Sequence, residues 1–289
     1  MHADLDTLCT AVYCTADDLL PTRPGNARRR VTDAEVATLC VAQAIMGIPS
    51  DRRFLAVARR RLRHLFPELP AQPGFHKRRA RLGETIEWLT GVFAASSPGF
   101  HDDLLLIDST PVECARSVET TRRSALADAA DHGYCASHSR FFWGFRLHCL
   151  FAPDGTPRAF TLASPRRDER EVGLELLRRA ERRGGEIVIG DKGYAGRAFA
   201  ASVADLGATI VRPARRDEPA DGPHLAPIRQ RIESIFWTCK DILTLERHGA
   251  RTLHNLRARI AQRFLALAAC VSLNHMLGRP SRALVDYVA

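Results

Sequence analysis

Three acidic residues in this chain of 289 residues stand where a phosphoryl-transfer site would need them: Asp108, Asp191 and Glu233. Asp108 closes the apolar run 104–107, and Asp191 follows the mainly apolar run 186–190. Continuous apolar runs of this length are typical of strands that are buried on both faces. A carboxylate directly after such a strand lies at the carboxyl edge of the sheet, where open α/β folds bind their ligands.

Glu233 lies in the stretch Ala226–Asp241, which we expect to be a helix that brings a third carboxylate to the same edge. Hard divalent cations prefer oxygen ligands, so three acids from three separate elements predict a metal site. The alternative is that Asp108 and Asp191 are ordinary polar residues that cap the turns after two strands. Their combination with Glu233 favours the metal site.

The first 95 or so residues are expected to be helical. Thr32 and Glu35 have the spacing of a capping box, which predicts a helix over Asp33–Met46. Ser50 is a suitable N-cap for a second helix over Asp51–Phe66, and a third is expected over Gly83–Ala95.

After residue 99 the pattern changes to strands that alternate with helices. The expected strands are Leu104–Asp108, Phe141–Phe151, Arg158–Leu162, Glu186–Ile189 and Ala208–Val211, and the expected helices are Asp168–Arg183, Arg197–Leu206 and Ala226–Asp241. Pro111–Ser139 is expected to be a polar, irregular connection, and Phe141, Phe142, Trp143 and Trp237 are expected in the core. The order predicts an α/β fold with a mixed sheet flanked by helices, divided into a helical region 1–99 and a catalytic domain 100–289.

The positive charge is concentrated in one stretch. The net charge is +9, and between Arg52 and Arg81 ten basic residues face the single acid Glu68, so the rest of the chain is neutral overall. Such a patch indicates a polyanionic partner, and the two helices that flank residues 47–50 suggest a helix-turn-helix. A solvated helix face is the alternative. The candidate DNA contacts here are Arg52, Arg53, Arg59, Arg60 and Arg63.

No membrane segment or secretion signal is expected. The N-terminus is acidic and lacks a basic-then-apolar pattern, and the apolar stretch Phe264–Leu273 is too short to span a bilayer, which favours a buried helix. Eight scattered cysteines fit reduced thiols. We therefore expect a cytoplasmic, nucleoid-associated protein without membrane contact.

Three segments carry a resemblance to a known family. They are Ile107-Asp108-Ser109-Thr110-Pro111, Gly190-Asp191-Lys192-Gly193-Tyr194, and Arg229 followed by Glu233 and Lys240 with three and six residues between them. In these segments the chain resembles the DDE transposases of bacterial insertion sequences, which carry an RNase H-like domain. The family pattern has a tyrosine three residues before the arginine, where this chain has Ala226. Residues 50–54 and 59–66 are also similar to the insertion sequence 982 group.

The resemblance implies a metal-dependent DNA transposase with an RNase H-like catalytic domain and an N-terminal helical DNA-binding region. It implies two Mg²⁺ or Mn²⁺ ions held by Asp108, Asp191 and Glu233, and DNA contacts by Lys192, Arg229 and Lys240. The partners would be the terminal inverted repeats and target DNA, with a homo-oligomer forming on DNA. Two alternatives remain: an RNase H-like nuclease without strand transfer, and an inactive DNA-binding repressor derived from a transposase.

Overall fold

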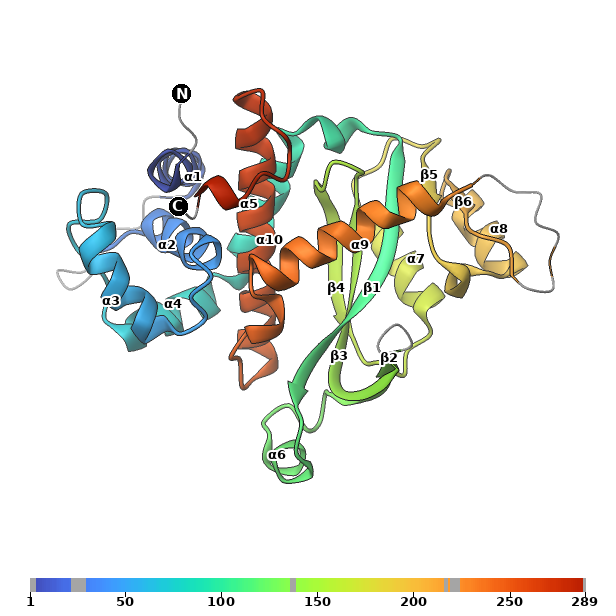
Figure 1. The fold of residues 1–289 in the computed structure, drawn as a ribbon, viewed down its shortest axis with the longest axis horizontal. Helices are drawn as coiled ribbons and strands as arrows, with labels where there is room; N and C mark the ends of the chain where they lie inside the picture. The colour runs from blue at the N-terminus through green and yellow to red at the C-terminus, as the bar shows by residue number, and fades with distance from the viewer. Residues whose placement is uncertain (1–3, 22–29, 136–138, 216–217, 219–223, 288–289) are drawn as a thin grey trace. The chain divides into compact units, whose positions relative to one another are not determined.

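The computed structural model describes residues 4–21, 30–135, 139–215, 218 and 224–287. The chain divides into two compact units (Figure 1). The first unit combines residues 1–96 with residues 238–289, and the second unit comprises residues 97–237. Residues 238–289, which we expected to belong with the catalytic half, therefore group with the N-terminal helices.

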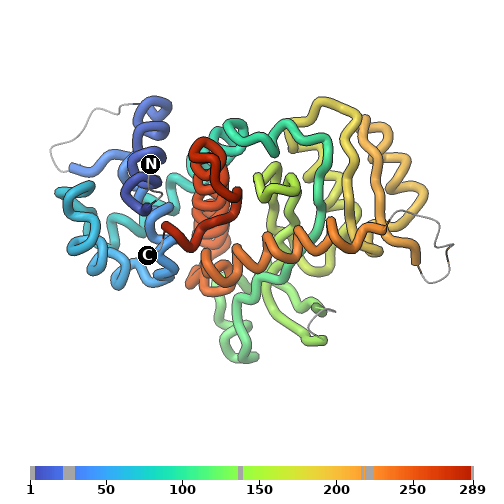
Figure 2. The backbone as a smooth tube through the Cα atoms, turned by 45° about the horizontal axis from the view of Figure 1, so that its top comes forward, coloured from blue at the N-terminus to red at the C-terminus, as the bar shows by residue number. Residues whose placement is uncertain are grey.

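The first unit is built of helices around two buried ones. The helices are α1 (Leu5–Leu19), α2 (Asp33–Ile45), α3 (Asp51–Arg61), α4 (Gln72–Arg81), α5 (Gly83–Ala95) and α10 (Leu253–Met276). Every residue of α2 from Val36 onward is buried, and so is every residue of α10 from Ala258 to Asn274. Helix α10 packs on α5 and α2, so the two ends of the chain lie side by side here, as the blue and red segments of Figure 2 show.

The predicted helices of this unit are confirmed, with one shorter than expected. Helix α5 has the predicted bounds, and α2 starts directly after its N-cap Thr32, which forms the predicted capping box with Glu35. Helix α3 ends at Arg61, because the backbone of Leu62 has left helical geometry (φ −115°, ψ 16°). We did not predict α1 and α4. Helix α4 has a proline in its first turn, where the missing N–H costs no hydrogen bond.

The second unit contains one mixed six-stranded sheet. Its strands are β1 (Leu104–Ala115), β2 (Asp131–Cys135), β3 (Arg140–Phe151), β4 (Pro157–Ala163), β5 (Ile187–Ile189) and β6 (Thr209–Val211). The order is β2-β3-β1-β5-β6, with β4 also paired to β3. Strand β1 is antiparallel to β3 and parallel to β5, which is parallel to β6. The predicted hairpin of β3 and β4 is confirmed.

We expected Pro111–Ser139 to be an irregular connection, and this prediction is wrong. Residues 136–138 lie outside the described residues, but the rest of the stretch contains regular structure. Strand β1 continues to Ala115, and a short helix α6 (Val118–Arg123) and strand β2 follow. The reason is long-range pairing: β3 keeps β1 extended well past the last β1–β5 pair at Leu106. Pro111 is tolerated because beyond Leu106 no described strand pairs with that edge.

Helices cover the sheet on both faces. Leu105 and Ile107 of β1 pack with α7 (Glu169–Arg179) and α8 (Arg197–Asp205) in one apolar cluster. On the other face α9 (Ala226–Asp241) crosses the strands (Figure 1), and the ring of its Phe236 lies 5.9 Å from that of Phe151 on β3. This mixed, curled sheet between helices fits an RNase H-like fold.

Two aromatic residues predicted for the core are wrong. Phe142 and Trp143 are buried, but Phe141 is 78% exposed and Trp237 is 60% exposed. Neighbouring strand residues point to opposite faces, so Phe141 points away from buried Phe142. It packs on the half-exposed ring of Tyr134, 5.1 Å away between centroids.

Candidate active site

Sheet register brings two of the predicted acids together. Strands β1 and β5 run parallel, with Leu106 paired to Ile189. Asp108 and Asp191 each lie two residues beyond this pair, so they sit side by side at the same height of adjacent strands, which lie about 4.8 Å apart. Residues of a strand alternate between faces, so Asp108 shares the α9 face with Leu106.

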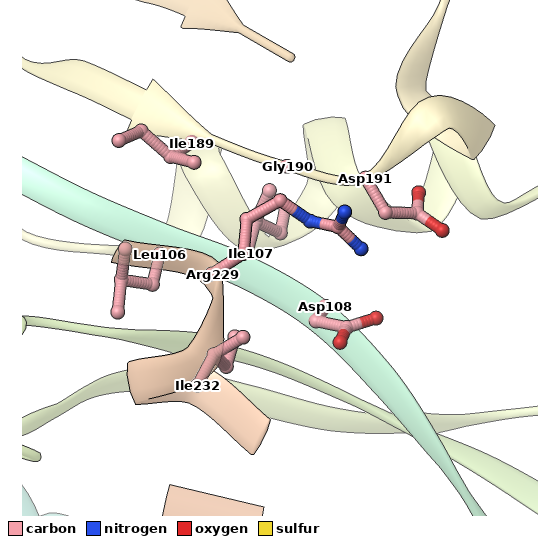
Figure 3. Close-up of a pocket in the computed structure, with 8 residues that line it drawn as sticks. All are labelled: Leu106, Ile107, Asp108, Ile189, Gly190, Asp191, Arg229 and Ile232. Atoms are coloured by element: carbon pink, nitrogen blue, oxygen red, sulfur yellow. The ribbon is translucent and has the colours of Figure 1, made fainter. Parts of the chain in front are cut away.

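A small pocket opens at this place, and Figure 3 shows both carboxylates and the side chain of Arg229. The pocket is lined by Leu106, Ile107, Asp108, Ile189, Gly190, Asp191, Arg229 and Ile232. The guanidinium of Arg229, which comes from the first turn of α9, points toward the space between the two carboxylates (Figure 3). Strand ends and the start of α9 therefore build one site inside the second unit.

Backbone groups hold each carboxylate. One oxygen of Asp108 accepts the N–H of Ser109 at 2.7 Å, and one oxygen of Asp191 accepts the N–H of Gly193 at 2.7 Å. Asp191 is the N-cap of a 3-10 helix over Lys192–Tyr194, which orients its side chain. A carboxylate has about four lone-pair sites, so both groups keep oxygen lone pairs for a cation.

The electrostatics of the site favour a bound cation. Burial raises the pKa of Asp108 to about 7, and the charges of Asp191 and Glu169 add to this, against the Ser109 N–H and Arg229, which lower it. Like charges are thus held close together in a partly desolvated place, and a hard divalent cation would relieve their repulsion. The donor set fits Mg²⁺ or Mn²⁺.

We expect the pH dependence of stability to reveal this crowding in the metal-free protein. The native Asp108 carboxyl holds its proton up to a pKa of about 7, against 3.8 for an ordinary aspartate, so stability falls as pH rises between these values. Asp108→Asn should remove this loss, which is up to roughly 4 kcal/mol. The measurement is the free energy of unfolding in chelator from pH 4 to pH 8.

The control for this experiment is Asp205→Asn, which changes an exposed carboxylate of the same unit. Its curve should follow that of the wild type. A wild-type curve parallel to that of Asp108→Asn would contradict the crowding.

Glu169 is an acid near this site that sequence reasoning missed. It is the first residue of α7, and one of its oxygens accepts the Ser109 hydroxyl at 2.5 Å. Burial raises its pKa, and the charge of Asp191 does so further, while the Ser109 bond and Arg146 lower it. The available signal was weak, because acids at the start of a helix are common for reasons of the helix dipole alone.

Glu233 is not part of this pocket. It is exposed on α9, one turn after Arg229. In the described parts of the chain, no group of three or more His, Cys, Asp or Glu side chains is arranged to hold a metal ion. Lys192 is exposed directly after Asp191, and Lys240 lies 3.5 Å from Glu246 within the first unit.

The basic stretch of the first unit separates into exposed and internal arginines. Arg52, Arg53, Arg59, Arg60 and Arg63, all on or just after α3, are exposed. Arg78 instead pairs with Asp33 at 2.6 Å, and Arg79 is fully buried. The surface patch is therefore smaller than the sequence count indicates, but it is concentrated on one helix.

A buried polar network fixes the start of that helix. Asp51, the first residue of α3, accepts bonds from Arg79 and from Arg259 of α10, both at 2.7 Å. Gln43 and Gln262 extend the network, and Gln262 also donates to the carbonyl of Cys40 at 2.7 Å. The network ties α2, α3, α4 and α10 together beneath the exposed arginines.

The class of fold comes first: the mixed sheet between helices fits an RNase H-like fold. The model of one family, described as the transposase DDE domain, matches residues 99–269. The chain belongs to this family. No curated protein and no solved structure gives a significant match. Among the described residues, no helix has both the length and the apolar character needed to cross a membrane.

Proposed function

We propose that this chain is the transposase of an insertion sequence of the 982 group. It cleaves the ends of its element and joins them to target DNA in the cytoplasm, on the nucleoid. The observation that carries this proposal is the pair Asp108 and Asp191, which face one pocket on neighbouring parallel strands within the family's domain. The shorter matches at residues 50–54 and 59–66 support the group.

Asp108 and Asp191 would hold divalent cations from their positions at the pocket, and two bound ions would activate the attacking oxygen and stabilise the leaving oxygen. Glu233, which lies outside the pocket in this structure, would be the third ligand. Arg229 directs its guanidinium into the pocket (Figure 3), where a planar fork suits phosphate oxygens. Arg229 and Glu233 are four residues apart, so they share one face of α9.

Glu233 approaches the pocket only if its side chain turns along that face of α9. Lys192 and Lys240 flank the acidic motifs and supply further contacts to the DNA backbone. Ala226, which replaces the family's tyrosine, lies at the first position of α9.

The exposed arginines of α3 form a second contact surface, for the terminal inverted repeats. The surface comprises Arg52, Arg53, Arg59, Arg60 and Arg63, and in the described part of the chain none of them is in an ion pair. Guanidinium groups without protein partners are free to bind phosphates. Two ends and a target must be held at once, so the active form is a homo-oligomer on DNA.

A strand-transfer assay with pre-cut ends tests the proposed function. The full chain, Mn²⁺ and labelled duplexes that carry the element's ends are mixed with plasmid target. The expected product is a covalent joint between an end and the plasmid. Strand cleavage without joints would instead indicate an RNase H-like nuclease, and binding without cleavage would indicate a repressor.

The salt dependence of DNA binding tests the arginine surface. The triple variant Arg59→Ala, Arg60→Ala and Arg63→Ala should bind the terminal repeats more weakly. The slope of log K against log salt should flatten by about 0.9 per lost phosphate contact, which is up to about three units. The measurement is a titration by fluorescence anisotropy at several salt concentrations.

The matched control removes three exposed arginines from other places, Arg178, Arg251 and Arg257. It makes the same change in net charge, so it separates local contacts from the general field of the protein. Equal slopes for the two triple variants would show that the α3 arginines are only a solvated face.

A further inference from the structure

We propose that Trp237 of α9 stacks on an unpaired base of the DNA strand that is cut in the pocket of Asp108 and Asp191. The indole ring thereby holds this strand in register with the pocket. This inference rests on the proposed function, because it takes DNA as the substrate of that pocket. It concerns a residue that none of the three matched motifs specifies, and a contact to a base rather than to a phosphate or a cation.

The packing of α9 on the sheet fixes the direction in which Trp237 points. Ile232, Ile235 and Phe236 are buried, and the ring of Phe236 lies 5.9 Å from that of Phe151 on β3. These contacts fix the rotation of the helix about its axis, so that the next residue, Trp237, turns away from the sheet and is 60% exposed. Trp237 and the pocket both belong to the second unit.

Trp237 continues a row of side chains that begins in the pocket. Arg229, Glu233 and Trp237 follow one another at intervals of four residues on α9, and residues with this spacing lie one above the other on a helix. Arg229 directs its guanidinium between the two carboxylates (Figure 3). At a rise of about 1.5 Å per residue, Trp237 lies roughly 12 Å further along the helix. Side chains of a helix lean toward its N-terminus, which is here the end at the pocket, so a strand that leaves the pocket along this row passes the indole ring.

The chemistry of the indole ring selects a base as its partner. An exposed apolar side chain is by itself common on protein surfaces, so the place of Trp237 beside the active site is what distinguishes it. The ring is uncharged, has one N–H donor and no acceptor, and presents a flat aromatic face. A base presents a matching flat face, whereas a phosphate group does not. Aromatic side chains at DNA-binding surfaces stack on bases in this way whatever the sequence.

The stacked base must have left the duplex. Inside a duplex the two faces of each base are covered by its neighbours, so an aromatic side chain reaches a base only where the stack is open. A distance of roughly 12 Å corresponds to about three to four nucleotides at the spacing of one strand of B-form DNA, and to fewer in a stretched strand. We therefore expect the opened base within about four nucleotides of the phosphate that is cut.

The test combines Trp237→Ala with abasic DNA. Labelled terminal repeats carry a single abasic site, placed in turn at each position near the cut, and the initial rate of strand cleavage by the full chain in Mn²⁺ is measured at low DNA concentration. On intact DNA, Trp237→Ala should cut about fivefold or more slowly than the wild type, as expected for the loss of one base–aromatic contact. With the abasic site at the stacked position the two rates should become equal, because the ring then has no base to stack on.

Two further variants separate stacking from other effects. Trp237→Phe keeps an aromatic face and should retain most of the rate on intact DNA. The matched control is Trp88→Ala, which removes a tryptophan that is 50% exposed on α5 of the first unit, and it should cut every DNA at the wild-type rate. Trp237→Ala should also leave the slope of log K against log salt for DNA binding unaltered, because an uncharged ring displaces no counterions from the DNA.

Two results would overturn the inference. One is cleavage of intact DNA by Trp237→Ala at the wild-type rate, and the other is a deficit of this variant that stays the same wherever the abasic site is placed. A wild type that does not cut its terminal repeat would contradict the proposed function itself, and this inference with it. A wild type that cuts its repeat, together with either of the two results, would contradict only the role of Trp237.

Discussion

Asp108→Asn and Asp191→Asn are each expected to reduce the rates of strand cleavage and strand transfer by about a thousandfold or more. When catalytic groups act as one unit, removing one of them costs nearly as much activity as removing all of them. Either change removes a charged oxygen ligand from a pocket that both residues line. The double variant should be hardly less active than either single variant. The measurement is the initial rate of cleavage of a labelled terminal repeat in Mn²⁺.

DNA binding separates this expectation from a failure to fold. Both variants should bind the terminal repeat with unaltered affinity, because the proposed contact surface lies on α3. Asp205→Asn, which changes an exposed carboxylate of α8, should keep full activity. Robust cleavage by Asp191→Asn would show that this residue is only the cap of the 3-10 helix that follows it.

Asp51→Asn is expected to lower the free energy of unfolding by about 3–5 kcal/mol. Asp51 and both of its guanidinium partners, Arg79 and Arg259, are buried. Burial alone would raise the pKa of this carboxyl, but the bonds and charges of Arg79 and Arg259 outweigh it and hold the pKa well below its usual range. An amide in its place leaves two buried cations without a counter-ion and turns an NH₂ group toward donors.

Urea unfolding near neutral pH measures this loss. The native pKa of Asp51 is depressed, so its stabilisation is complete above the pKa of an unfolded aspartate, about 4, and is lost as pH falls below that. The control is Asp6→Asn, whose partner His64 lies 2.6 Å away but is exposed. That variant should lose no more than about 1 kcal/mol. Similar losses for the two variants would contradict a special role of the buried network.

Part of the fold could be predicted because its signals are local. The capping box at Thr32, the turn of the β3–β4 hairpin and the periodicity of α9 each depend on residues close together in the chain. The strand β1 beyond Asp108 could not be predicted, since Ser109, Thr110 and Pro111 read as a turn. Only the long pairing with β3 keeps these residues extended.

The sequence by itself determined that Asp108 and Asp191 end two apolar runs, and this suffices for a pair of acids at one edge, because parallel strands present their carboxyl ends together. It also determined the family through three short motifs and their spacing. The tertiary structure decided which other charged side chains lie near this pair. Arg229 lines the pocket and Glu233 is exposed, whereas Glu169 contacts Ser109 and Arg146 near the site.

The same division holds for the basic stretch. The net charge between residues 52 and 81 follows from the sequence alone, because it is the sum of the charges of the residues in that stretch. Which of these arginines are exposed to solvent depends on residues far away in the chain. The carboxylate of Asp51, for example, binds both Arg79 and Arg259, and Arg259 is 208 positions away from Asp51. The packing of α2, α4 and α10 in the first unit separates the internal arginines, Arg78 and Arg79, from those that are exposed.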